Sequence, residues 1–218
     1  MWVNELRLIS PEDDADWAGI GNVDIKLADL GSISANFRHS LPNFHKLEER
    51  FGNRRTNTEW SVSLQGNLEK FAPKSFSGMK VPISYTHSEF FENPEYVANS
   101  DINLDEAADA VYRDAYDSTQ NSGIASEEAQ EFREESQTYR VQDRWAITGV
   151  QLGLPTKFWM IDKTLNRITF TYSYSQEYER SPVVEERFSW IWKLSAKYSV
   201  NLPKLLEFEH MGWAEDVP

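Results

Sequence analysis

The chain has 218 residues and a formal net charge of −13, which argues against nucleic-acid binding because phosphate contact needs a basic surface. It has no cysteine, so disulfides, a thiol nucleophile and cysteine-ligated metals are excluded. No run of about 18 apolar residues occurs, so no transmembrane helix is expected.

The amino-terminal region, residues 1–94, is predicted to consist of strands. Turn signals divide it at Pro11–Asp14 and at Gly31. Residues 41–55 are expected to form a loop with a short helical turn, and residues 72–80 a further connection. The candidate strands are 2–10, 16–29, 32–40, 57–70 and 79–91. No signal peptide precedes the first of them, which suggests a piece of a longer chain or a processed one.

The strand at 57–70 alternates in polarity from one residue to the next. Trp60, Val62 and Leu64 fall on one parity and Gly66 shares it, while the other parity holds Ser61, Ser63, Gln65 and Asn67. Successive side chains of a strand point to opposite faces of the sheet. The segment is therefore predicted to have an apolar face and a hydroxyl- and amide-rich face.

Residues 95–136 differ in composition from the rest. They hold twelve acidic residues and two arginines, which is −10 of the total charge. Helical spacing relates Leu104, Ala107, Ala108, Val111, Ala115 and Tyr116. A second helical pattern begins at Ser126 after the break at 121–123. The segment is predicted to be an acidic, partly helical insertion outside the sheet.

The carboxyl-terminal region, residues 137–202, returns to alternation, with candidate strands at 138–152, 166–180 and 186–202. The last of these is the longest, and only Ile191 breaks its pattern. Soluble strands peak near about 5–6 residues, whereas a tilted strand that crosses a bilayer needs roughly 9–11. Residues 203–218 are expected to form a linker or a truncated tail.

The pattern predicts an all-β fold: an antiparallel meander of long strands that forms a segment of a transmembrane β-barrel wall, with the acidic insertion attached. A large soluble β-sandwich with one polar face is the alternative. The predicted lipid-facing residues are Trp60, Val62, Leu64, Ile168, Phe170, Tyr172, Tyr174, Phe188, Trp190 and Trp192. The predicted lumen-facing residues are Ser61, Ser63, Gln65, Asn67, Thr169, Thr171, Ser173 and Ser175.

Catalytic and metal-binding motifs are lacking. The four histidines (His39, His45, His87 and His210) have no metal-ligand spacing. A loop that begins at Asp14 has the glycine of a calcium loop but not its later ligands. No Walker loop, GxSxG or dinucleotide fingerprint occurs. We therefore expect no enzymatic activity, no metal and no cofactor.

Short motifs in a fixed order carry a family resemblance. They are Trp2–Arg7, Asp16–Ala18, Ile25–Leu30, Leu47–Arg50, Leu68–Lys74, Val81–Ile83, Asn93–Tyr96, Ser100–Ile102 and Phe170–Ser175. In this order and rough spacing the chain resembles SprA/Sov, the giant outer-membrane translocon of the type IX secretion and gliding-motility system. The similarity extends over about residues 2–200, which would be roughly a tenth of such a protein.

The resemblance implies a role in protein transport across the outer membrane of a Gram-negative bacterium. It implies as partners the remaining strands of the parent barrel, secreted cargo proteins, plug and shuttle proteins and outer-membrane lipid. The chain is too short to close such a pore, and the acidic insertion matches the family only at 93–102. The alternatives are an autonomous small outer-membrane barrel and a soluble β-rich binding or adhesion module.

Overall fold

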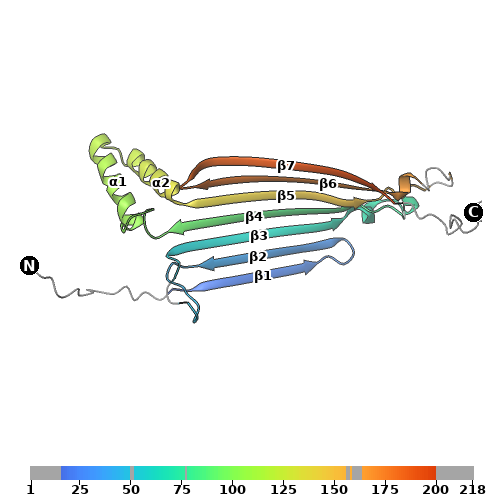
Figure 1. Ribbon diagram of the computed structural model, residues 1–218, viewed down its shortest axis with the longest axis horizontal. Coiled ribbons are helices and arrows are strands. Elements are labelled where there is room, and N and C mark those ends of the chain that lie inside the picture. The colour runs from blue at the N-terminus through green and yellow to red at the C-terminus, as the bar shows by residue number, and fades with distance from the viewer. Residues whose placement is uncertain (1–15, 50–51, 77, 156–157, 159–163, 200–218) are drawn as a thin grey trace, which may run out of the picture.

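The computed structural model describes residues 16–49, 52–76, 78–155, 158 and 164–199. Seven long strands and two helices account for most of them (Figure 1). The strands are β1 (Ala18–Lys26), β2 (Gly31–Ser40), β3 (Arg55–Asn67), β4 (Pro82–Pro94), β5 (Thr138–Val150), β6 (Ile168–Ser181) and β7 (Val184–Tyr198). The helices are α1 (Leu104–Thr119) and α2 (Ser122–Ser136), and short 3-10 turns lie at Leu68–Phe71, Lys74–Phe76 and Leu165–Arg167.

The strands form one antiparallel sheet in which each pairs with its neighbours in the sequence, in the order β1 to β7. The predicted meander is confirmed. The described sheet is open, because β1 and β7 lie at its opposite edges (Figure 1). An eighth candidate strand, residues 2–10, falls outside the described residues. The alternative of an autonomous small outer-membrane barrel therefore has no closed sheet in the described part of the chain.

The strand ends differ from the predicted ones by a few residues. β1 ends at Lys26, three residues early, because a turn over 27–30 closes the hairpin: the Leu27 amide donates to the Gly31 carbonyl, and the Leu30 amide donates to the Leu27 carbonyl. A Cβ on Gly31 would collide with the Gln65 carbonyl oxygen, so this position needs glycine. The described part of the 41–54 loop contains turns and not the expected helical turn.

The two helices join β4 to β5 at one end of the sheet, which we call the helix end (Figure 1). Each begins with an asparagine cap. The Asn103 side chain accepts hydrogen bonds from the amides of Asp105 and Glu106, and the Asn121 side chain accepts from those of Gly123 and Ile124. The cap starts α2 at Ser122, whereas the sequence pattern predicted a start at Ser126. Residues 121–123 thus initiate the second helix as well as separating the two.

The buried hydrophobic residues of the described chain all belong to this helix hairpin. They are Leu104, Ala108, Ala115, Ala125 and Ala129. Alanine allows two helices to approach closely, so a segment with few large apolar residues still packs into a defined hairpin. The sheet is a single layer with no second layer against it among the described residues (Figure 1). No described helix has the length and apolar character that spanning a membrane requires.

Candidate functional site: the two faces of the open sheet

The register divides the sheet into two chemically different faces, because residues paired across antiparallel strands project to the same side. Leu64 pairs with Tyr85, which pairs with Trp145. The row continues through Tyr174 and Trp192. We call this side the aromatic face. All the predicted lipid-facing residues share it: Trp60, Val62, Leu64, Ile168, Phe170, Tyr172, Tyr174, Phe188, Trp190 and Trp192.

Large apolar side chains on the aromatic face are exposed. On β7 the exposed fractions are 62% for Phe188, 56% for Trp192 and 65% for Leu194. Exposed apolar side chains occur on the first strand as well, for example at Val23. Large exposed apolar side chains gathered on one face are characteristic of contact with membrane or protein.

The opposite side, which we call the polar face, carries all the predicted lumen-facing residues. Ser63 pairs with Thr86, and their hydroxyls lie 3.2 Å apart. The set comprises Ser61, Ser63, Gln65, Asn67, Thr169, Thr171, Ser173 and Ser175. The structure therefore brings each predicted set together on its own face of the sheet.

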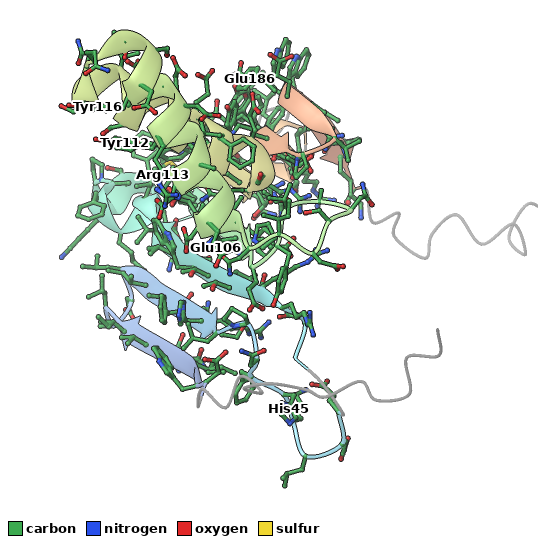
Figure 2. The ribbon with its side chains drawn as sticks, turned by 90° about the vertical axis from the view of Figure 1, so that its left-hand side faces the viewer. His45, Glu106, Tyr112, Arg113, Tyr116 and Glu186 are labelled. Atoms are coloured by element: carbon green, nitrogen blue, oxygen red, sulfur yellow. The ribbon has the colours of Figure 1, made fainter. Side chains whose placement is uncertain are left out.

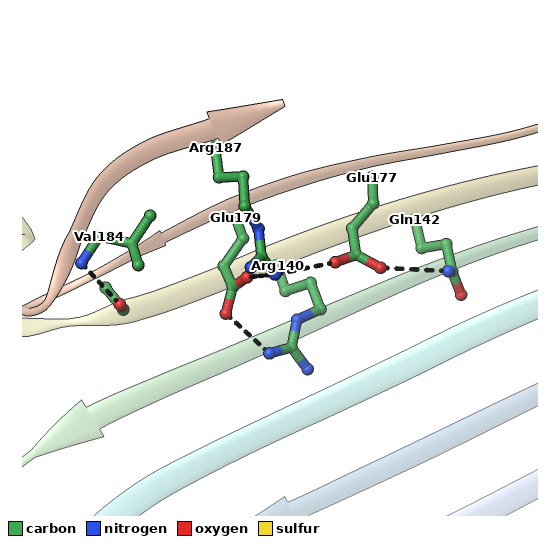
Figure 3. Close-up of polar contacts among 7 residues, drawn as sticks. Arg140, Gln142, Glu177, Glu179, Val184 and Arg187 are labelled. Carbon is green, nitrogen blue, oxygen red and sulfur yellow. Dashed lines mark hydrogen bonds and ion pairs between the residues drawn. The ribbon is translucent and has the colours of Figure 1, made fainter. Parts of the chain in front are cut away.

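Ion pairs cross the polar face near the helix end (Figure 3). Glu179 on β6 accepts hydrogen bonds from Arg140 on β5, at 2.8 Å, and from Arg187 on β7. Glu177 accepts from the Gln142 amide, at 3.3 Å, and lies 3.5 Å from Arg187. These residues join three consecutive strands in charge-assisted contacts. The alternation in the sequence predicted a face rich in hydroxyls and amides. It did not predict which charged residues pair across strands, because that depends on the register of the sheet.

Ile191, the exception in the alternation of the last strand, lies on the polar face opposite Ser175. It lines a shallow hollow of about 510 Å³ together with Arg144, Glu177 and Lys193. The hollow is open to solvent, and most of the residues that line it are polar.

A polar network interrupts the aromatic face, and sequence reasoning missed it. His87 on β4 lies with Nδ1 2.8 Å from Asp143 Oδ1 and with Nε2 3.2 Å from Glu89 Oε1. The Tyr85 hydroxyl donates to Asp143 Oδ1 at 2.6 Å, and the Gln176 amide donates to Asp143 Oδ2 at 3.1 Å. The sequence does contain a signal for it. Ile83 and Tyr85 are alternate residues of β4, and continuing the alternation places His87 and Glu89 on the same face.

The acidic hairpin extends beyond the end of the sheet rather than lying over either face (Figures 1 and 2). Figure 2 views this end, with Glu106, Tyr112 and Tyr116 on α1. Arg133 on α2 lies 3.2 Å from Asp105 and 3.7 Å from Asp109 on α1, so it links the two helices. The two helices are thus held together by their buried alanines and by the ion pairs of Arg133.

Among the described residues, an ion pair ties the helix hairpin to the sheet. The Arg180 guanidinium of β6 lies 2.6 Å from Glu134 of α2. This hydrogen bond, assisted by the Gln130 amide, holds the pKa of Glu134 below its usual value of 4.5. Because the pKa is lowered on folding, the pair contributes stability above about that value, and the contribution is lost as the pH falls through the lowered pKa.

We expect Arg180→Gln to loosen α2 at neutral pH without unfolding the sheet. Both side chains are partly exposed, so solvent screening limits the loss to about 1 kcal/mol or less. Hydrogen-exchange protection of residues 122–136 in the detergent-solubilised parent protein should fall about fivefold at most. The wild type should show the same loss only in acid, below about pH 4.5. Arg38→Gln, which removes the exposed pair with Glu59, should leave this protection unchanged.

Metal-binding geometry is not found in the described part of the chain, where no group of three histidine, aspartate or glutamate side chains could hold an ion. Of the four histidines, His210 lies outside the described residues. His87, with its two carboxylate neighbours, belongs to the polar network described above.

Comparison with known proteins shows that part of the chain matches a protein family. Residues 1–108 match the model of the SprA_N family, described as a motility related/secretion protein. The matched segment covers β1 to β4 and ends within α1. No curated protein matches the chain.

Proposed function

Because the chain belongs to the SprA/Sov family, we propose that its sheet is a wall segment of the outer-membrane protein-translocation pore of the type IX secretion and gliding-motility system. Family membership itself gives the chain a motility- and secretion-related role. The finer assignment to a pore wall is our proposal. The segment would act by structure alone, without catalysis and without a cofactor.

The observation that carries this proposal is a long two-faced sheet without a core of its own. Five of the seven strands have 13 to 15 residues, which exceeds the roughly 9–11 residues that a tilted strand needs to cross a bilayer. The buried hydrophobic residues lie in the helix hairpin, not in the sheet. Such a sheet needs an apolar medium against its aromatic face, and lipid supplies one.

The polar face suits a water-filled lumen. Hydroxyls and charged groups on it contact neighbours on the same face, as at Ser63 and Thr86 or Arg140 and Glu179. Outer-membrane barrels alternate apolar-out and polar-in residues in this way. In the proposed pore this face would border the path of the secreted cargo proteins, and plug and shuttle proteins would act at the same lumen.

The two edge strands of the sheet indicate where further strands would bind. β1 pairs only with β2, and β7 pairs only with β6, within the described residues. An unpaired edge offers a row of backbone donors and acceptors to another strand. In the proposed pore the remaining strands of the parent barrel would occupy both edges.

A charge placed on one face should have a much larger effect than the same charge on the other. Leu194 lies on the aromatic face of β7 and Ser195 on its polar face, so the two positions have nearly the same depth. Leu194→Arg should cost about 2–4 kcal/mol if the side chain meets hydrocarbon. We expect it to reduce assembled parent protein in the outer membrane and the secretion of its cargo, both measured by immunoblot.

Ser195→Arg is the matched control, and it should leave both quantities close to wild type. Its polar-face partner is Thr171, in a region that already holds Lys193 and Lys197 on the same side of β7. Equal tolerance of arginine at both positions would contradict a lipid-facing aromatic face. Equal loss at both would instead indicate protein packed against both faces.

A further inference from the structure

The chemistry of the aromatic face changes along the strands. Paired residues form rows across the sheet, and one row consists of Val62, His87, Asp143, Gln176 and Trp190. The next row toward the helix end holds Trp60, Glu89, Val141, Tyr178 and Phe188. Both polar and aromatic side chains occur in these two rows, so the helix-end third of the face is mixed.

The polar groups in the mixed rows are held in place by one another. His87 bridges Asp143 and Glu89, and the Trp60 indole Nε1 donates to Glu89 Oε2 at 3.0 Å. The Gln176 carbonyl oxygen lies 3.2 Å from the Tyr174 hydroxyl. Each carboxylate therefore has hydrogen-bond donors on more than one side. Both carboxylate side chains remain partly exposed, Asp143 by 19% and Glu89 by 29%.

The adjoining rows on the other side of the network have no carboxylate, histidine, lysine or arginine side chain. The first is the row of Leu64, Tyr85, Trp145, Tyr174 and Trp192. The next is Ile83, Ile147, Tyr172 and Leu194. Beyond them Phe170 pairs with Ala196, and Ile168 pairs with Tyr198. The charged side chains of the mixed rows, which lie on β4 and β5, and the Gln176 amide beside them on β6 all end at this one level of the sheet.

We propose that this level is the boundary of the membrane hydrocarbon on the helix side. This inference rests on the proposed function. The rows from Tyr85 toward the end opposite the helices contact lipid acyl chains, with Tyr85, Trp145, Tyr174 and Trp192 as the aromatic girdle. The row of His87, Asp143 and Gln176 lies among lipid headgroups, and the acidic helix hairpin lies in water beyond it.

Two physical arguments favour this placement. Charged side chains on the lipid face of a barrel destabilise it strongly at mid-membrane and little near the interface, so a network with two carboxylates belongs at the edge. Tyrosine and tryptophan rings concentrate at the interfaces, where an apolar ring and a polar group are both accommodated. The four uncharged rows, at roughly 5 Å of height each in a tilted strand, supply about 20 Å of the ~25 Å apolar band.

The test uses the parent protein, with any cysteine elsewhere in it replaced, reconstituted in lipid vesicles. A nitroxide is attached to single cysteines along the aromatic face of β7, at Phe188→Cys, Trp190→Cys, Trp192→Cys, Leu194→Cys and Ala196→Cys. These exposed positions take part in none of the network hydrogen bonds described above, so the network stays intact. Electron paramagnetic resonance then compares collisions with oxygen, which enters hydrocarbon, and with a water-soluble nickel chelate.

We expect oxygen collisions to exceed nickel collisions at Leu194→Cys and Ala196→Cys, and the order to reverse at Phe188→Cys, with the crossover near Trp190→Cys. Oxygen dominance that continues through Phe188→Cys would overturn the boundary while leaving the wall intact. Low collision rates with both reagents at Phe188→Cys and Trp190→Cys would also overturn it, since protein would then cover the network. Nickel dominance at every position would reject the proposed function itself. Ser189→Cys and Ser195→Cys on the polar face are controls for water access.

Discussion

Ser63→Cys and Thr171→Cys, introduced singly into the membrane-embedded parent protein, are expected to react with a water-soluble maleimide. Leu64→Cys and Phe170→Cys should remain largely unreacted. Each reactive position is the sequence neighbour of a protected one, so depth in the membrane is nearly the same within a pair. The difference should therefore report only the face, because adjacent residues of a strand project to opposite sides.

The absence of cysteine from this chain makes the labelling unambiguous within the segment. Extent of reaction is measured by the gel shift of a maleimide-linked polymer in intact membranes. Full reaction of all four positions after solubilisation and unfolding is the control for reagent access. Equal labelling of both members of each pair in membranes would contradict the membrane-wall function.

The second large effect concerns the chain on its own. Expressed without flanking strands, it should aggregate in water and become dispersed only in detergent. Its sheet has two unpaired edges, an exposed aromatic face and no buried hydrophobic residue of its own in the described part. Exposed strand edges and large apolar patches both promote association. Size-exclusion chromatography with light scattering, with and without detergent, measures the outcome.

A surface-substituted variant sharpens this experiment. Replacing Phe188, Trp190, Trp192 and Leu194 by threonine keeps β-propensity and removes much of the exposed apolar surface of β7. We expect it to aggregate less than the wild-type chain. A wild-type chain that is a monodisperse monomer in water, with a cooperative thermal transition, would favour the soluble binding or adhesion module.

The sequence by itself determined the local structure and the two-sided character of the strands. Alternation at 60–67 and 168–175 separated the residues into the two sets that the register places on opposite faces, because the period of a strand is fixed by its backbone. The acidic segment was predicted to be helical and outside the sheet for the same kind of local reason. Its second helix was predicted four residues late because the Asn121 cap was read only as a break.

The tertiary structure decided what depends on register and on packing between distant segments. His87 and Asp143 are 56 residues apart in sequence, and only the β4–β5 pairing places them in one row. The same holds for Glu179 between Arg140 and Arg187, and for the alanines that pack the helix hairpin. A strand's parity is a local property of the chain, whereas its partner and alignment are set by the energy of the whole sheet. Hence the polar network, and the membrane boundary we infer from it, could be found only in the folded chain.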